Sequence, residues 1–153
     1  MNCEKFDSAI KAALSNYGPL GVDVKLMFAQ DTVSPNPPYD WYKVCLQVTP
    51  VVLHPETYFE IWNYGGLITH RKIEHLEGCR PINQNRIVSA CKAAQQLPPG
   101  FPLPEANCEL YWPIYPGVNE PIYSFHTDNV CIQVGAYTCQ ILQTTDTKQP
   151  ATL

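Results

Sequence analysis

The sequence predicts an α+β protein made of two tandem units, each a helix packed on a curved antiparallel sheet. An alanine-rich segment occurs twice, as SAIKAAL at residues 8–14 and as SACKAAQ at residues 89–95. Each copy is followed by short runs of β-branched and aromatic residues separated by proline, glycine and asparagine, which is typical of antiparallel strands with tight connections. We therefore assign residues 1–78 to one unit and residues 79–153 to the other, whether they fold apart or pack as one domain.

The first helix is predicted at residues 5–17. Apolar side chains recur there at the spacing of one helix face, starting at Phe6 and Ile10. The Gly18-Pro19 pair then ends the pattern, because proline cannot continue a helix and glycine is common just past a helix end. The segment is long enough for about three turns.

The second helix is predicted at residues 86–97. Ile87, Cys91 and Ala94 form a narrower apolar stripe, and the sequence PPG that follows ends the helix. An unpaired cysteine often behaves as a small buried apolar residue. We therefore expect Cys91 to lie in the core rather than to act as a nucleophile.

Three runs after each helix predict the strands. They are VDVKLMFAQ, DWYKVCLQVTPVV and TYFEIWNYGGLITHRKI in the first unit, and CELYWPIYP, EPIYSFHT and NVCIQVGAYTCQILQT in the second. The last runs align without a gap and place Tyr64 on Tyr137, so each is expected to form a strand, a turn and a return strand. Strand alternation places Val44, Leu46 and Val48 under a helix and leaves the opposite, outer face wetter.

The second unit resembles PepSY-type modules, in which an alanine-rich helix leads to a strand carrying Tyr and then to a strand ending near DAxTG. The segment from NRIVSACKAAQQL to CIQVGAYTCQIL carries the resemblance, mainly over residues 85–142, and the ending GAYTC keeps the Ala and the Thr but not the Asp or the final Gly. Such modules are similar in shape to cystatins, so the resemblance implies protein binding, including protease inhibition in some members. The cystatin loop motif Q-x-V-x-G is absent, because Gln133-Val134-Gly135 lacks both spacers.

The expected binding surface combines the outer face of the sheet with two proline-rich loops, SPNPPYDW at residues 34–41 and YWPIYPGVNEP at residues 111–121. Exposed Trp and Tyr side chains anchor protein interfaces, and prolines reduce the entropy that a loop loses on docking. The alternative is that both loops are stiff surface connections. The expected binding residues are Tyr39, Trp41, Tyr111, Trp112 and Tyr115.

Composition favours a protein partner. The net charge is -4 and, apart from Arg71-Lys72, the cations are scattered, whereas nucleic-acid binding requires clustered positive charge. No stretch approaches the ~20 apolar residues of a membrane span, so we expect a soluble chain. We predict a small non-catalytic protein-binding module, with inhibition as one form of binding and oligomerisation left open. The alternatives are a small enzyme with a pocket in a curved sheet and a subunit of a larger protein assembly.

We expect no catalytic residue, no metal and no cofactor. His70, His75 and Cys79 lack the usual ligand spacing and a fourth ligand. His126 can activate Cys131 only if the intervening TDN sequence turns the chain.

Seven cysteines without a C-x-x-C motif leave at least one thiol free or paired between chains. The compartment stays open: cytoplasmic for the chain as written, secreted if a leader has been removed.

Overall fold

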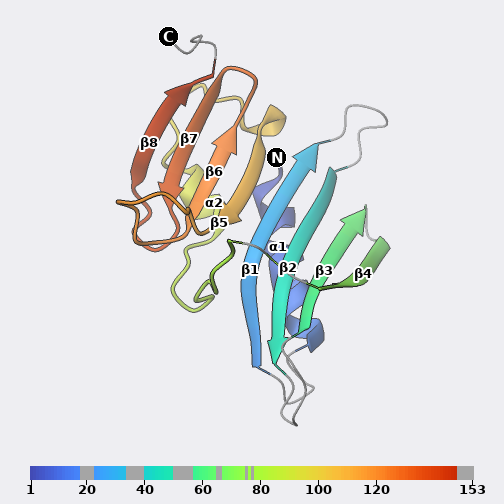
Figure 1. The fold of residues 1–153 in the computed structure, drawn as a ribbon. Coiled ribbons are helices and arrows are strands. Elements are labelled where there is room, and N and C mark those ends of the chain that lie inside the picture. Colours follow the sequence, from blue (N-terminus) through green and yellow to red (C-terminus); the bar gives the residue numbers. More distant parts are fainter. Residues whose placement is uncertain are drawn as a thin grey trace.

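The structure is a computed structural model with eight strands in one antiparallel sheet, ordered β4-β3-β2-β1-β5-β6-β7-β8 (Figure 1). It describes residues 1–17, 23–33, 40–49, 57–64, 67–74, 76 and 78–147. The helical elements are α1 (Cys3–Tyr17), α2 (Ala90–Ala94) and the 3₁₀ turn η2 (Leu103–Glu105). The strands are β1 (Asp23–Val33), β2 (Asp40–Thr49), β3 (Thr57–Tyr64), β4 (Leu67–Ile73), β5 (Asn107–Tyr111), β6 (Ile122–His126), β7 (Val130–Gly135) and β8 (Ile141–Asp146).

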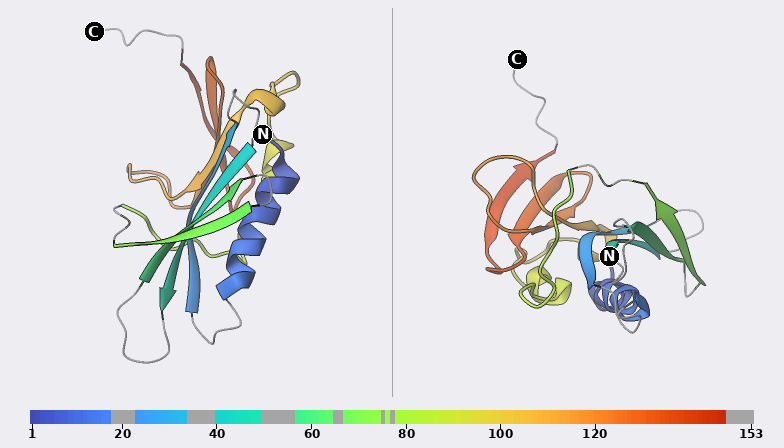
Figure 2. Two further views of the ribbon diagram at one scale, coloured as in Figure 1. Left: turned by 90° about the vertical axis from the view of Figure 1, so that its right-hand side faces the viewer. Right: turned by 60° about the horizontal axis from the view of Figure 1, so that its bottom comes forward.

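The helix predicted at residues 5–17 is present as α1, which lies across one face of β1 and β2 (Figure 2). Its buried side chains, including Phe6 and Ile10, lie on one stripe. The Phe6 ring centroid is 6.4 Å from that of Tyr42 on β2 and 6.4 Å from that of Tyr123 on β6. One helix therefore contributes to the core beneath both halves of the sheet.

The prediction of two tandem helix-on-sheet units is wrong. In β1, Ala29, Gln30 and Asp31 pair with Leu110, Glu109 and Cys108 of β5, so the strands of both predicted units belong to one continuous sheet. The second predicted helix is reduced to the five residues of α2, which packs against α1.

Hydrogen bonds to the backbone of residues 88–92 explain why α2 begins late. The Val88 N–H donates to the Ala136 carbonyl at 2.8 Å, which ties the preceding chain to the end of β7 instead of allowing it to coil. The Ser89 hydroxyl then accepts a hydrogen bond from the Lys92 N–H at 3.1 Å, as a helix N-cap does. The Asp7 carboxylate accepts two more, from the N–H groups of Ala90 and Cys91 at 2.7 and 3.3 Å.

Irregular segments cover the β5–β8 half of the sheet where a helix was expected. Tyr123 and Phe125 on β6 and Val134 on β7 are fully buried. The Tyr123 hydroxyl donates to the Val88 carbonyl at 2.7 Å, so the chain before α2 closes over this ring. Apolar side chains in α2 and on both sides of it also pack against the same core, and they are Ile87, Val88, Ala94, Leu97, Phe101 and Leu103.

A disulfide joins the two parts of the chain on the helix side of the sheet. Cys3 in the first turn of α1 is bonded to Cys91 of α2, 88 residues later in the sequence. The expectation that Cys91 is an unpaired core residue is therefore wrong. The Met1 amino group adds hydrogen bonds to the carbonyls of Leu103 and Pro104 at 3.0 and 2.8 Å.

In the part of the chain that the structure describes, no helix has the length and apolar character needed to cross a membrane.

Candidate functional site

The outer face of the sheet, opposite α1, carries a polar row that crosses every strand. Directly opposed residues form it: Thr69, Trp62, Lys43, Gln30, Glu109, Ser124, Gln133 and Gln143, from β4 to β8. The prediction for β2 is confirmed, since Val44, Leu46 and Val48 belong to the core beneath α1. The outer face is therefore the surface from which a site can be built.

A groove of about 320 Å³ lies on this face where β1 adjoins β5. The segment after β4 and the connection between β5 and β6 both project on the side of the sheet away from α1 (Figure 2). The lining combines aromatic rings with one aliphatic side chain, one carboxylate and one thiol. These residues are Phe28, Tyr111, Trp112, Tyr115, Ile114, Glu109 and Cys79, with Gly78 beside them.

Gly78 lies where the two projecting segments meet. Its φ of 71° lies in the left-handed region, which favours glycine. A Cβ at this position would lie 3.7 Å from Cγ2 of Ile114, so the segments meet at this point. Ile114 and Tyr115 are nevertheless 84% and 39% exposed, which leaves apolar surface at the rim of the groove.

Hydrogen bonds hold the polar groups of the groove in place. The Tyr115 hydroxyl donates to Oε1 of Gln133 on β7 at 2.7 Å. Nε2 of Gln30 donates to Oε1 of Glu109 at 3.1 Å, which orients this carboxylate within the lining. The Trp112 indole N–H donates to the Pro81 carbonyl at 2.9 Å. The groove is thus built from side chains that are already positioned before any partner binds.

Two titratable groups of the groove, Cys79 and Tyr111, favour their neutral forms. Burial raises the pKa of the Cys79 thiol, while the nearby Lys43 charge lowers it to a lesser degree. Burial, with the neighbouring Tyr115 and Glu109, raises the pKa of Tyr111 to about 12. At neutral pH the thiol and the phenol therefore keep their protons. Protonated thiols are poor nucleophiles, so this lining is suited to contact rather than to covalent chemistry.

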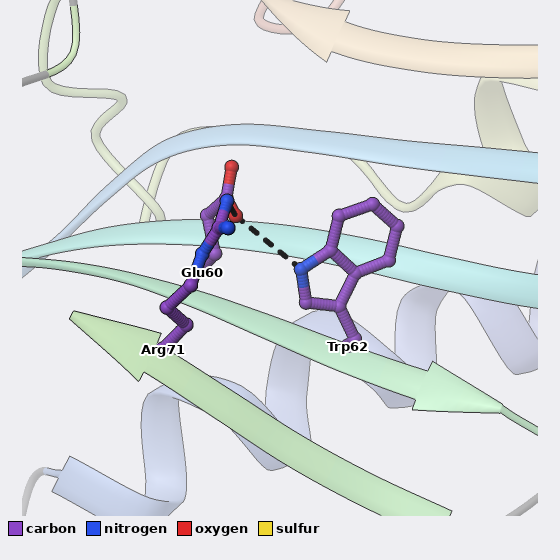
Figure 3. Close-up of polar contacts among 3 residues, drawn as sticks. All are labelled: Glu60, Trp62 and Arg71. Carbon is purple, nitrogen blue, oxygen red and sulfur yellow. Dashed lines mark hydrogen bonds and ion pairs between the residues drawn. The ribbon is translucent and has the colours of Figure 1, made fainter. Parts of the chain in front are cut away.

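A second aromatic cluster extends the outer face across β2–β4. The Trp41 and Trp62 rings lie 4.8 Å apart between centroids, and Nζ of Lys43 lies 5.3 Å from the Trp62 centroid. Oε2 of Glu60 accepts hydrogen bonds from Arg71 at 2.7 Å and from the Trp62 indole at 3.4 Å (Figure 3). These contacts neutralise the charges locally and keep the Trp62 ring oriented.

The structure brings three of the five predicted binding residues together. Tyr111, Trp112 and Tyr115 line the groove. Trp41 is on the outer face of β2 but packs on Trp62 instead of lining the groove. Tyr39 lies outside the described residues.

Sequence reasoning missed Phe28, which also lines the groove. Strict alternation from the buried Leu26 would place Phe28 in the core. A β-bulge between Leu26 and Phe28 shifts the register, so that Phe28 pairs with Cys45 and Ala29 takes the core position. Its Lys43 neighbour, with Nζ 5.2 Å from the Phe28 centroid, offered no signal in the sequence because the two residues meet across strands. Glu109 and Cys79 were not expected in a binding surface, because each joins this lining only through its neighbours in space. Ile114 belongs to the predicted loop at residues 111–121 but was not among the predicted binding residues.

The two sets of histidine and cysteine residues that the sequence analysis weighed have different outcomes. The TDN sequence does turn the chain, and His126 pairs directly with Cys131 across β6 and β7. The Cys131 sulfur lies 3.3 Å from the Ser124 hydroxyl, within hydrogen-bonding distance. His75, from the set His70, His75 and Cys79, lies outside the described residues. No cluster of three or more His, Cys, Asp or Glu that could hold a metal occurs in the described ranges.

Comparison with known proteins yields a fold but no family. No family model matches the chain, and no curated protein matches it. Among solved structures, the chain is similar to a candidate lipoprotein of Clostridium difficile 630, with a TM-score of 0.55, 13% sequence identity and 90% of each chain covered. At this identity the likeness shows the fold alone. The resemblance to PepSY-type and cystatin-like modules stays a prediction.

Proposed function

We propose that the protein is a small non-catalytic protein-binding module that receives an apolar side chain of a partner protein in the outer-face groove. The observation that carries this proposal is the exposure of Ile114, at 84%, beside an aromatic groove that is already formed. Exposed apolar surface bordering a preformed groove is typical of interaction sites. Aromatic side chains are also the residues that most often anchor interfaces.

The chemistry of the groove supports binding over catalysis. An enzyme of the thiol class needs a cysteine whose pKa is lowered, whereas burial raises that of Cys79. The described lining pairs this thiol with a single carboxylate, Glu109, which is already engaged by Gln30. Acid–base catalysis by carboxylates commonly uses two titratable groups whose environments push their pKa values apart. Blocking the active site of an enzyme is one form that such binding takes.

Charge favours a partner segment with a basic residue next to its apolar one. The chain has a net charge of -4, and Glu109 is the charged side chain in the groove lining. Opposite charge speeds association and selects the partner more than it adds affinity. The Cys3–Cys91 disulfide favours a setting that is oxidising enough for the bond to persist.

The test is a peptide-display selection on the purified protein, followed by affinity measurements on the selected peptides. Selected peptides should carry an aromatic or aliphatic residue beside Lys or Arg. The Ile114→Ser/Tyr115→Ser double variant should bind them at least about tenfold more weakly, because both anchors are lost. Ile68→Ser is the matched control, since Ile68 is 47% exposed on β4 and does not line the groove.

Two results would contradict the proposal. One is a set of peptides that binds the double variant as tightly as the wild type. The other is a loss of affinity in Ile68→Ser that equals the loss in the double variant. A thermal unfolding measurement on all variants separates lost binding from lost folding, and little change is expected because each substituted side chain is partly or largely exposed.

A further inference from the structure

The two edge strands of the sheet differ in how they are protected from pairing. β4 carries Arg71 and Lys72, and charged side chains of this kind discourage edge-to-edge association. β8, with the sequence ILQTTD, has no Lys, Arg or Pro, and all of its side chains are exposed. Ile141 and Leu142 are 47% and 41% exposed. Within the described ranges, β7 is the strand that pairs with β8.

The direction of the backbone groups in β8 can be worked out from its pairing. The Thr147 N–H donates to the Asn129 carbonyl at 2.9 Å. In the same register Thr145 is opposite Cys131 and Gln143 is opposite Gln133. Since antiparallel strands exchange hydrogen bonds at every second residue, Gln143 and Thr145 bond to β7. The N–H and C=O groups of Thr144 and Asp146 therefore point toward the open edge.

We propose that β8 pairs with β8 of a second copy of this chain, antiparallel and about a twofold axis at Thr144. The pairing makes one sheet continuous across two copies. A twofold axis suits a strand edge, because antiparallel pairing presents the same set of donors and acceptors from both copies. In this register Thr144 of one copy faces Thr144 of the other, and Leu142 faces Asp146. The inference does not depend on the groove.

Charge supports a second copy as the occupant of this edge. Asp146 is the one ionisable residue of β8. In the proposed register the two Asp146 side chains are offset by four residues, or about 13 Å along the strand. This exceeds the screening length of about 8 Å at physiological ionic strength, so they repel weakly. Self-pairing of β4 would instead place two cations from each copy, Arg71 and Lys72, along the shared edge.

The bulge that ends regular pairing near Gln133 limits the contact to a short stretch of β8. A bulge at a sheet edge is itself a device that restricts pairing. Small interfaces give weak complexes. We therefore expect a reversible dimer that forms at tens of micromolar protein or above, on the order expected for a small interface.

Cysteine cross-linking tests the register. Thr144→Cys should form an intermolecular disulfide under mild oxidation, because opposed residues in a hydrogen-bonded antiparallel pair are about 5.5 Å apart between Cα atoms, within disulfide range. Gln143→Cys is the matched control, exposed on the same strand but not opposite itself. The wild type has free thiols of its own, so it gives the background level of covalent dimer. We expect several-fold more covalent dimer for Thr144→Cys than for either control on a non-reducing gel.

Sedimentation velocity over a range of concentrations tests the association itself. The average mass of the wild type should rise with concentration, and Thr144→Lys should suppress the rise because two cations would then face each other. Gln143→Lys, which adds the same charge one residue away, should suppress it less. The proposal is overturned if the mass stays monomeric up to about tenfold above the expected range. It is also overturned if Gln143→Cys cross-links as efficiently as Thr144→Cys.

Discussion

The β1–β4 and β5–β8 halves of the sheet are covered in different ways but are buried equally well. Over β1 and β2 lies α1, a helix of 15 residues, whereas the second half is preceded by α2, which has five. Yet Tyr123 and Phe125 in the second half are as fully buried as Leu26 and Leu46 in the first. A sheet face thus needs apolar cover, and irregular chain held by hydrogen bonds can provide it as well as a helix can.

Contacts between the two halves of the chain explain why side chains in both halves of the sheet are fully buried. Phe6 of α1 touches the cores of both, the Cys3–Cys91 disulfide ties α1 to α2, and Asp7 caps the start of α2. The short helix is therefore held in place by the long one. Three variants test how much each link contributes.

Phe6→Ala should have the largest effect. The ring is 1% exposed, and truncating a buried Phe to Ala costs about 3–5 kcal/mol of unfolding free energy. Because Phe6 contacts both cores, hydrogen exchange should accelerate in β2 and in β6. Urea unfolding measures the loss, with Ile68→Ala as the exposed control. Acceleration confined to β2 would show that α1 does not support the second half.

Removing the disulfide should have the next largest effect. The Cys3→Ser/Cys91→Ser variant should lose about 2–4 kcal/mol of unfolding free energy, because the bond constrains a long loop in the unfolded chain. Cys139→Ser, which alters a free cysteine in the second half, is the control. Equal stability of the double variant and the wild type would mean that packing of α1 already places α2.

Asp7→Asn should have the smallest effect, and its signature is a dependence on pH. Burial raises the pKa of Asp7 above 3.8, outweighing the hydrogen bonds from Ala90 and Cys91 that lower it. The folded state therefore binds a proton more tightly than the unfolded state. This contribution to stability is fully present below the ordinary pKa and is lost as the pH rises through the raised value.

Asp7→Asn lacks this titration, so the stability of the wild type relative to the variant should fall as the pH increases from about 3 to 7. Unfolding free energies of both proteins at a series of pH values measure the difference. A difference that grows with pH would instead indicate that the hydrogen bonds to the carboxylate dominate over its burial.

The sequence by itself determined the local elements. The apolar spacing from Phe6 and the Gly18-Pro19 stop predicted α1, and the β-branched runs predicted the strands, because both depend on neighbours along the chain. Alternation in β2 also predicted which side chains face the core. Tyr111, Trp112 and Tyr115 were selected as aromatic residues near prolines, and they share one groove.

Only the tertiary structure decided how these elements combine. The pairing of β1 with β5 joins residues about 80 positions apart, and no local pattern specifies such a partner or its register. The bulge before Phe28 moved that ring to the outer face against the alternation of its own strand. Val88 lies outside the helix, and its N–H is bonded to the Ala136 carbonyl. In each case the free energy comes from a contact distant in sequence, which local propensity cannot contain.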